Sequence, residues 1–181
     1  MSTSSQSPFA YLAELAAQIR ACDPQLPAEE VVKTSWSGIG FNVLGQRMVA
    51  PLGEIIEMLP TPAATRLPGV QSWVLGLANV RGRLLPLFDL EAFLGGKLSS
   101  NRAAHRVLIL EMGELYAGLV VSEAYGMQHF PEGLDACELP SAVSHLAPYT
   151  KGAYEYNGTV WTTFSPFSLV RDPRFFNAAA A

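Results

Sequence analysis

The chain is poor in charge, cysteine and histidine, and each shortage excludes a class of protein. Charged residues make up 15% of its 181 residues and the net charge is −4, so it lacks the clustered Lys and Arg that grip nucleic acid. Cys22 and Cys137 lie far apart, which is typical of reduced thiols in the cytoplasm rather than of a disulfide framework. His105, His129 and His145 have no metal-ligand spacing, so we expect surface or turn positions for all three.

Long hydrophobic runs and catalytic signatures are lacking as well. No apolar run approaches the ~18 residues that span a bilayer, and the Ser-rich start lacks the regions of a signal peptide. We therefore expect a cytoplasmic protein without direct membrane insertion. The sequence contains no Gly-x-Ser-x-Gly elbow, and residues 38–40 lack the lysine of a nucleotide-binding loop. These absences predict a chain without catalytic residues, metal ligands or cofactors.

The composition that remains is that of a protein with a full apolar core. Hydrophobic residues make up 49% of the chain and the mean hydropathy is +0.19. A charged fraction below the ordinary ~25% indicates either that part of the surface is covered by partners or that the core is large. We predict three parts: a disordered start, helix and linker over 1–30, one folded domain of two lobes over 31–175, and a frayed tail over 176–181.

A single helix precedes the folded domain. Ser7 is placed to cap it and Pro8 to occupy its first position, while Pro24 prevents its continuation. Its one apolar face predicts packing against its own domain.

Short β runs separated by Gly, Pro and Asn turns fill the rest of the chain. The predicted strands cover 36–43, 47–51, 54–59, 75–80, 84–89, 106–112, 115–123, 125–130, 153–156 and 159–164. Short helices are expected over 65–73, 89–94 and 165–171. Many short strands indicate small barrels rather than a sandwich, and the chain lacks the long helices that a parallel sheet requires.

Residues 75–90 are the most informative segment. They form two apolar strands joined at a tight turn, and apolar residues on both faces indicate strands that are buried on both sides. Gly82 suits a turn position with positive φ. A turn that needs Gly82 alone leaves Arg81 and Arg83 available, and a basic tip on a rigid hairpin is typical of a surface shown to another protein.

This order of elements resembles the CheW-type coupling proteins of bacterial chemosensory arrays. The resemblance is most specific in Gly-Leu-Ala-Asn-Val-Arg-Gly at 76–82 and Leu-Pro-Leu-Phe-Asp-Leu at 85–90. Ile-Ile-Glu-Met at 55–58 and the strand at 117–123 support it, although Ser122 and Glu123 fit the family pattern loosely. It extends over about 35–171. The leading helix and the aromatic C-terminus resemble the branch of the family that controls type IV pili and twitching motility.

The resemblance implies a mainly β fold of two five-stranded SH3-like β-barrels side by side, with an extra N-terminal helix and short connecting and C-terminal helices. It implies no enzymatic activity and no cofactor. It also implies two partners, which are the regulatory domain of a CheA-type histidine kinase and the cytoplasmic tip of a methyl-accepting chemoreceptor. The function expected is that of an adaptor that couples these two proteins.

The resemblance also points to a docking site. The family has an arginine at the position of Arg81 and a glutamate at that of Glu57, and an arginine fork can hold a carboxylate through two hydrogen bonds. We hypothesise an ion pair that braces the hairpin, while Arg83 is expected to be solvated. The predicted partner-binding residues combine this pair with the neighbouring apolar and glycine positions: Ile55, Ile56, Glu57, Leu75, Gly76, Arg81 and Gly82. For any single apolar member, a core position is the better expectation.

Other interpretations stay open. The same adaptor role is possible in a flagellar chemotaxis system. A peptide-binding SH3-like module unrelated to a kinase, the regulatory end of a kinase and a small β-barrel enzyme are further alternatives. Binding to a kinase domain distinguishes the adaptor from the peptide module and from the enzyme.

Overall fold

The computed structural model describes residues 8–21, 35–139 and 146–180, and the chain divides into two compact units, Met1–Lys33 and Thr34–Ala181. The first unit contains helix α1 (Pro8–Ala21), which begins at the predicted proline. The side chains of residues 9–18 are exposed. Among the described helices, none has both the length and the apolar character needed to cross a membrane.

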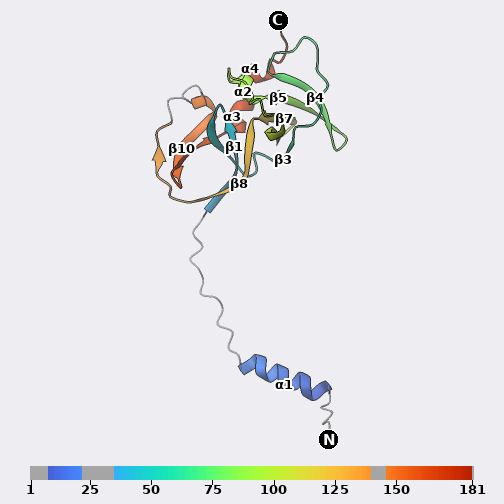
Figure 1. The fold of residues 1–181 in the computed structure, drawn as a ribbon, viewed down its shortest axis with the longest axis vertical. Coiled ribbons are helices and arrows are strands. Elements are labelled where there is room, and N and C mark those ends of the chain that lie inside the picture. Colours follow the sequence, from blue (N-terminus) through green and yellow to red (C-terminus); the bar gives the residue numbers. More distant parts are fainter. Residues whose placement is uncertain (1–7, 22–34, 140–145, 181) are drawn as a thin grey trace. The chain divides into compact units, whose positions relative to one another are not determined.

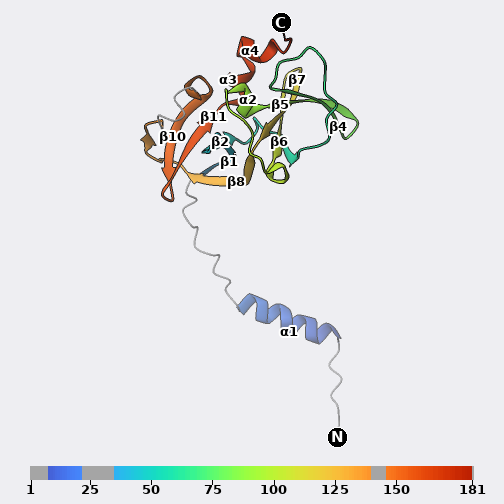
Figure 2. The same cartoon turned by 45° about the horizontal axis from the view of Figure 1, so that its top comes forward.

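The second unit is built from two curled sheets that lie side by side (Figures 1 and 2). The first sheet has the strand order β8-β1-β2-β11-β10-β9. Its neighbours are antiparallel except for β11 and β2, which are parallel. Its strands are β1 (Ser35–Val43), β2 (Gln46–Pro51), β8 (Glu123–Pro131), β9 (Ala136–Cys137), β10 (Thr150–Tyr156) and β11 (Thr159–Phe164).

The second sheet has the order β3-β6-β7-β5-β4, with β5 and β7 parallel. It consists of β3 (Glu57–Pro60), β4 (Val74–Val80), β5 (Arg83–Asp89), β6 (Arg106–Met112) and β7 (Leu115–Val121). The mainly β, two-lobed fold is confirmed. The first sheet has six strands rather than five because the short β9 pairs with β10.

The short helices are α2 (Leu90–Phe93), η1 (Arg102–Ala104), α3 (Pro166–Val170) and α4 (Pro173–Phe176). In the sequence α2 and η1 lie between β5 and β6, and α3 and α4 follow β11. In space α2, α3 and α4 lie near one another toward one end of the body (Figure 2). Two of them begin with the predicted caps, because the Asp89 side chain accepts a hydrogen bond from the Ala92 N–H and the Ser165 side chain from the Ser168 N–H.

The two lobes share their largest apolar core, and each lobe has a smaller buried cluster of its own. The largest cluster of buried apolar side chains takes Phe41 and Phe164 from the first sheet and Leu108 and Leu119 from the second. The C-terminal Phe175 belongs to the same cluster and is 3% exposed. Its ring lies 5.9 Å from that of Trp73, 4.8 Å from that of Phe88 and 5.7 Å from that of Phe93. Phe175 is thus a core residue.

Two predicted segments differ from the structure. Residues 65–73 form an irregular segment with turns at 68–69 and 72–73 instead of a helix, because Pro68 and Gly69 interrupt helical hydrogen bonding and Thr65 pairs with Leu77. The tail expected to fray pairs with this segment, since the Ala180 N–H donates to the Gly69 carbonyl over 3.0 Å. The extended piece predicted at 54–59 becomes a strand only from residue 57.

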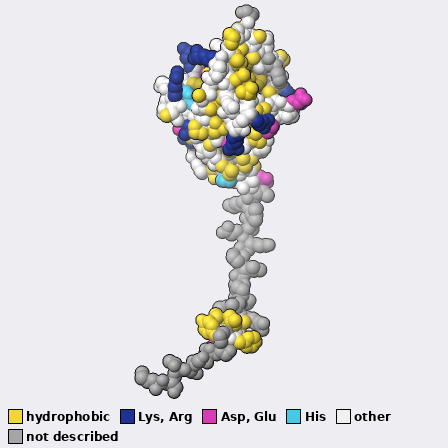
Figure 3. All heavy atoms as spheres, turned by 90° about the vertical axis from the view of Figure 1, so that its right-hand side faces the viewer, with side chains coloured by type: hydrophobic (Ala, Val, Ile, Leu, Met, Phe, Trp, Pro, Cys, Tyr) yellow, Lys and Arg dark blue, Asp and Glu magenta, His cyan; other side chains and the backbone are white. Residues whose placement is uncertain are grey.

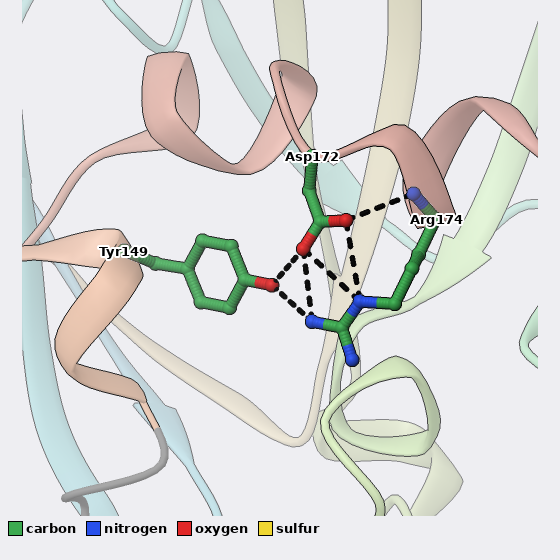
Figure 4. A network of polar contacts seen from close by, with 3 residues as sticks. All are labelled: Tyr149, Asp172 and Arg174. Carbon is green, nitrogen blue, oxygen red and sulfur yellow. Dashed lines mark hydrogen bonds and ion pairs between the residues drawn. The ribbon is translucent and has the colours of Figure 1, made fainter.

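Tyr149, Asp172 and Arg174 form a polar network that holds the C-terminal helices (Figure 4). Asp172 caps α4 by accepting from the Arg174 N–H at 2.8 Å, and it also accepts from Arg174 Nη2 at 2.8 Å. The Tyr149 hydroxyl donates to Asp172 and accepts from Arg174 Nη2 at 2.5 Å. Hydrogen bonds from Arg174 hold the pKa of Asp172 well below its usual range, and burial raises the pKa of Tyr149.

The Asp172 network predicts an acid-sensitive contribution to stability. A carboxyl group whose pKa is lowered by folding stabilises the protein above its unfolded pKa of ~3.9, and that stabilisation is lost as the pH falls toward the folded pKa. Asp172→Asn should therefore lower the free energy of unfolding by about 1 kcal/mol at neutral pH. Urea denaturation across a pH series measures the difference. A gap between wild type and variant that stayed constant down to the lowest pH would contradict the assignment.

Candidate docking site at the β4–β5 hairpin

The tip of the β4–β5 hairpin is a two-residue turn with an unusual backbone. Arg81 has φ +52° and Gly82 has φ +81°, and Val80 pairs with Arg83 across the turn. The Asn79 side chain accepts a hydrogen bond from the Gly82 N–H at 2.9 Å, as is typical of an asparagine at a turn. The expectation that Gly82 alone needs positive φ is wrong, because a two-residue turn that matches the twist of its strands requires positive φ at both positions.

Arg81 is an unfavourable residue for its turn position. A left-handed conformation costs a residue with a Cβ roughly 1–2 kcal/mol. Asn157 occupies the equivalent place in another hairpin, and asparagine tolerates it well. Leu44 occupies a third such place, and its side chain packs against the core. The Arg81 side chain is 77% exposed, so no core packing offsets its cost.

Arg81 pairs with Glu57, which confirms the predicted ion pair. Arg81 Nη2 lies 2.5 Å from Glu57 Oε1. Glu57 begins β3, and β3 and β4 are the two edges of the five-stranded sheet. The pair therefore joins the opposite edges of a curled sheet, where one hydrogen bond from Nη2 restrains the arginine side chain. As an exposed pair it adds only ~0–1 kcal/mol to stability.

The predicted contact residues separate into accessible and buried groups. Ile56 is 53% exposed, and Arg81 and Gly82 are exposed. Ile55 is 5% exposed and belongs to the core. Gly76 is also buried, because its Cα faces the Thr65 carbonyl. Burial removes these two from the predicted contact surface.

Leu75 is half-buried and Glu57 partly exposed. With Ile56, Arg81 and Gly82 they are the accessible members of the predicted set.

The hairpin carries two features that the sequence interpretation missed. Leu84 on β5 is 67% exposed whereas Leu85 is buried, and no sequence signal distinguishes the two neighbouring leucines of this apolar run. Arg83, expected to be solvated, pairs with Glu111 at 3.1 Å and lies 3.8 Å above the Tyr116 ring. Figure 3 shows exposed apolar and basic side chains intermixed on the right-hand face of Figure 1.

The histidines divide between surface and interior. His129 is exposed and its Nδ1 lies 2.7 Å from Ser37 Oγ. His105 is 8% exposed and is therefore no surface residue, but it ends the η1 turn, where its N–H donates to the Arg102 carbonyl, so the predicted turn position is confirmed. Its Nε2 lies 2.9 Å from the Ser99 carbonyl oxygen, a contact that compensates for the burial of the ring. His145 lies outside the described residues.

Comparison with known proteins places these features in a family. The model of the CheW-like domain matches residues 37–174. The protein PilI of Pseudomonas aeruginosa is 44% identical over 174 residues, which cover 96% of this chain and 97% of PilI. A probable chemotaxis protein CheW of Rhizobium etli is 30% identical over 83 residues, covering 46% of this chain and 54% of that protein.

A solved structure shares the fold. The scaffolding protein TtCheW of Thermoanaerobacter tengcongensis superimposes with a TM-score of 0.64 over 77% of this chain and 95% of that protein, at 15% sequence identity. At this identity the likeness concerns the fold alone.

Proposed function

The chain belongs to the family of CheW-like domains, and from that premise we propose that it is a non-catalytic adaptor which couples a chemoreceptor to a CheA-type histidine kinase. Its partners are the regulatory domain of the kinase and the cytoplasmic tip of the receptor. It works in the cytoplasm, and it binds neither nucleic acid nor the interior of the membrane.

The observation that carries this proposal is Arg81. The chain keeps an exposed arginine in a left-handed turn where asparagine or glycine would cost less. Backbone strain of this kind is concentrated at functional sites. The ion pair with Glu57 restrains the guanidinium, so the hairpin offers a partner a pre-oriented fork.

The exposed Ile56 and Leu84 supply the apolar part of such a surface. Apolar area beside a restrained arginine is the usual composition of an interface centre. An adaptor built this way acts by geometry. It holds receptor and kinase in one assembly, so a change in receptor conformation biases the kinase through contacts that differ between its states.

We further propose that the receptor system controls type IV pili and twitching motility. The similarity to PilI supports this choice, because it runs through 96% of the chain. The alignments with the CheW proteins of Rhizobium etli and Rhizobium meliloti cover 46% of the chain each.

Two titrations by calorimetry test the proposal. We expect the full chain to bind the isolated regulatory domain of its cognate CheA-type kinase, and separately to bind a helical-hairpin fragment of the receptor tip. Binding to neither fragment would refute the adaptor. Binding to a Pro-rich peptide in place of both would favour the SH3-like peptide module.

A further inference from the structure

Most Lys and Arg side chains of the described structure have a partner within the protein. Arg81, Arg83, Lys151 and Arg174 form ion pairs. Other arginines bond to a hydroxyl or to carbonyl groups, or lie over an aromatic ring: Arg47, Arg106 and Arg171. Within the described residues, the cationic side chains of Arg66, Lys97 and Arg102 have no ion pair, hydrogen bond or ring contact.

These three unpartnered cations line one hollow. It has a volume of about 640 Å³, and Ser99, Ser100 and the buried His105 contribute to its wall. The cations come from three separate places: the segment before β4, the loop after α2, and η1. The sequence separation of Arg66, Lys97 and Arg102 means that the fold itself brings them to one wall. We call this the cationic hollow.

Among the described residues that line the cationic hollow, one is acidic, Asp89. It is 9% exposed, and its carboxylate is engaged by the Ala92 N–H at the start of α2. It therefore offsets the surrounding charge only in part. A concentration of positive charge stands out on a chain whose net charge is −4. Like charges that share a hollow repel one another, and an anion bound there relieves that repulsion.

The lining distinguishes between kinds of anion. Pockets for small molecules are mostly apolar and enclose their ligand. Here most lining side chains are polar, and Arg66, Lys97, Ser99, Ser100 and Arg102 are exposed. The wall of this hollow is open and polar and carries three cationic side chains. Such a wall suits a peptide that carries several carboxylates, because each carboxylate can pair with a separate cation.

We propose that the cationic hollow binds an acidic segment of a partner protein, with Arg66, Lys97 and Arg102 receiving its Asp and Glu carboxylates. The hollow contains neither Glu57 nor Arg81, so it is a second docking surface. Leu75, predicted as a contact residue, lines this hollow and serves the second surface rather than the first.

The proposal is tested by nuclear magnetic resonance on the ¹⁵N-labelled full chain, with capped hexaglutamate peptide as the probe. We expect the peptide to shift the amide signals of Ser99, Ser100, Arg102 and His105. The double variant Arg66→Gln and Arg102→Gln should bind roughly tenfold more weakly. Neither side chain has a partner to lose, so the variant should keep its fold, which unchanged signals elsewhere verify.

The control variant Arg47→Gln and Lys151→Gln removes the same charge outside the cationic hollow. It should keep its affinity for hexaglutamate within about twofold. Equal weakening by both variants, or no shift at the hollow, would overturn the proposal, because general charge attraction would then account for the binding. If inorganic phosphate shifted the same amide signals and bound more tightly than hexaglutamate, the proposal would also be overturned, and the hollow would be a site for a small anion. The titration contains neither kinase nor receptor, so its failure leaves the adaptor proposal standing.

Discussion

Replacing Gly76 with alanine is expected to lower the free energy of unfolding by about 3 kcal/mol or more. Gly76 has φ +131°, and a Cβ added there would lie 2.1 Å from the Thr65 carbonyl oxygen. Thr65 cannot move away freely, because its N–H and carbonyl both bond to Leu77, at 2.8 Å and 2.9 Å. The added methyl group must therefore displace the segment that covers β4.

Gly82 provides the matched control for this variant. It lies in the same hairpin and also has positive φ, at +81°, but a Cβ there would meet nothing within 4 Å. Gly82→Ala should cost only the left-handed backbone penalty, about 1 kcal/mol. Urea denaturation of both variants makes the comparison. If Gly76→Ala were as mild as Gly82→Ala, the close approach of residue 65 to β4 would be wrong.

Replacing Arg81 with asparagine is expected to weaken binding to the kinase while leaving the stability of the fold nearly unchanged. Asparagine accepts the left-handed turn more readily than arginine does, which offsets the lost ion pair with Glu57. The free energy of unfolding should stay within about 1 kcal/mol of wild type. Affinity for the kinase regulatory domain should fall about 30-fold, as expected for the loss of an arginine at an interface centre.

Arg83→Asn removes the same charge two residues along the hairpin. Arg83 is occupied by Glu111 and by the Tyr116 ring, so its loss should change affinity by no more than about threefold. Calorimetric titration of the two variants, with urea denaturation alongside, makes the comparison. Equal losses of affinity would mean that net charge at the hairpin matters, rather than the oriented Arg81 fork.

The sequence predicted those parts of the fold that local patterns determine. Most strands follow from apolar runs bounded by Gly, Pro and Asn, and Asp89 and Ser165 cap their helices as expected. Residues 65–73 were predicted wrongly, because their backbone hydrogen bonds go to β4 and to the C-terminal tail. Pro68 and Gly69 were a local signal against the helix, whereas the long-range partners leave no trace in the local sequence.

The candidate docking site, like the fold, was predicted only in part from the sequence. The motif around Arg81 and the glutamate at 57 led to the ion pair that the structure contains. A core position was expected for any single apolar member, and buried Ile55 meets that expectation while Ile56 is exposed. Which of the two neighbours faces the core could not be predicted, since strand residues of opposite parity look alike in an apolar run. The cationic hollow was not foreseen, because Arg66, Lys97 and Arg102 are brought together only by the fold.

The adaptor claim is tested most directly by sedimentation velocity on three components: the kinase regulatory domain, the receptor-tip fragment and the full chain. We expect a ternary complex that forms only when the chain is present and that Arg81→Asn weakens. A kinase–receptor complex of the same size without the chain, or a chain that binds one fragment only by displacing the other, would contradict it.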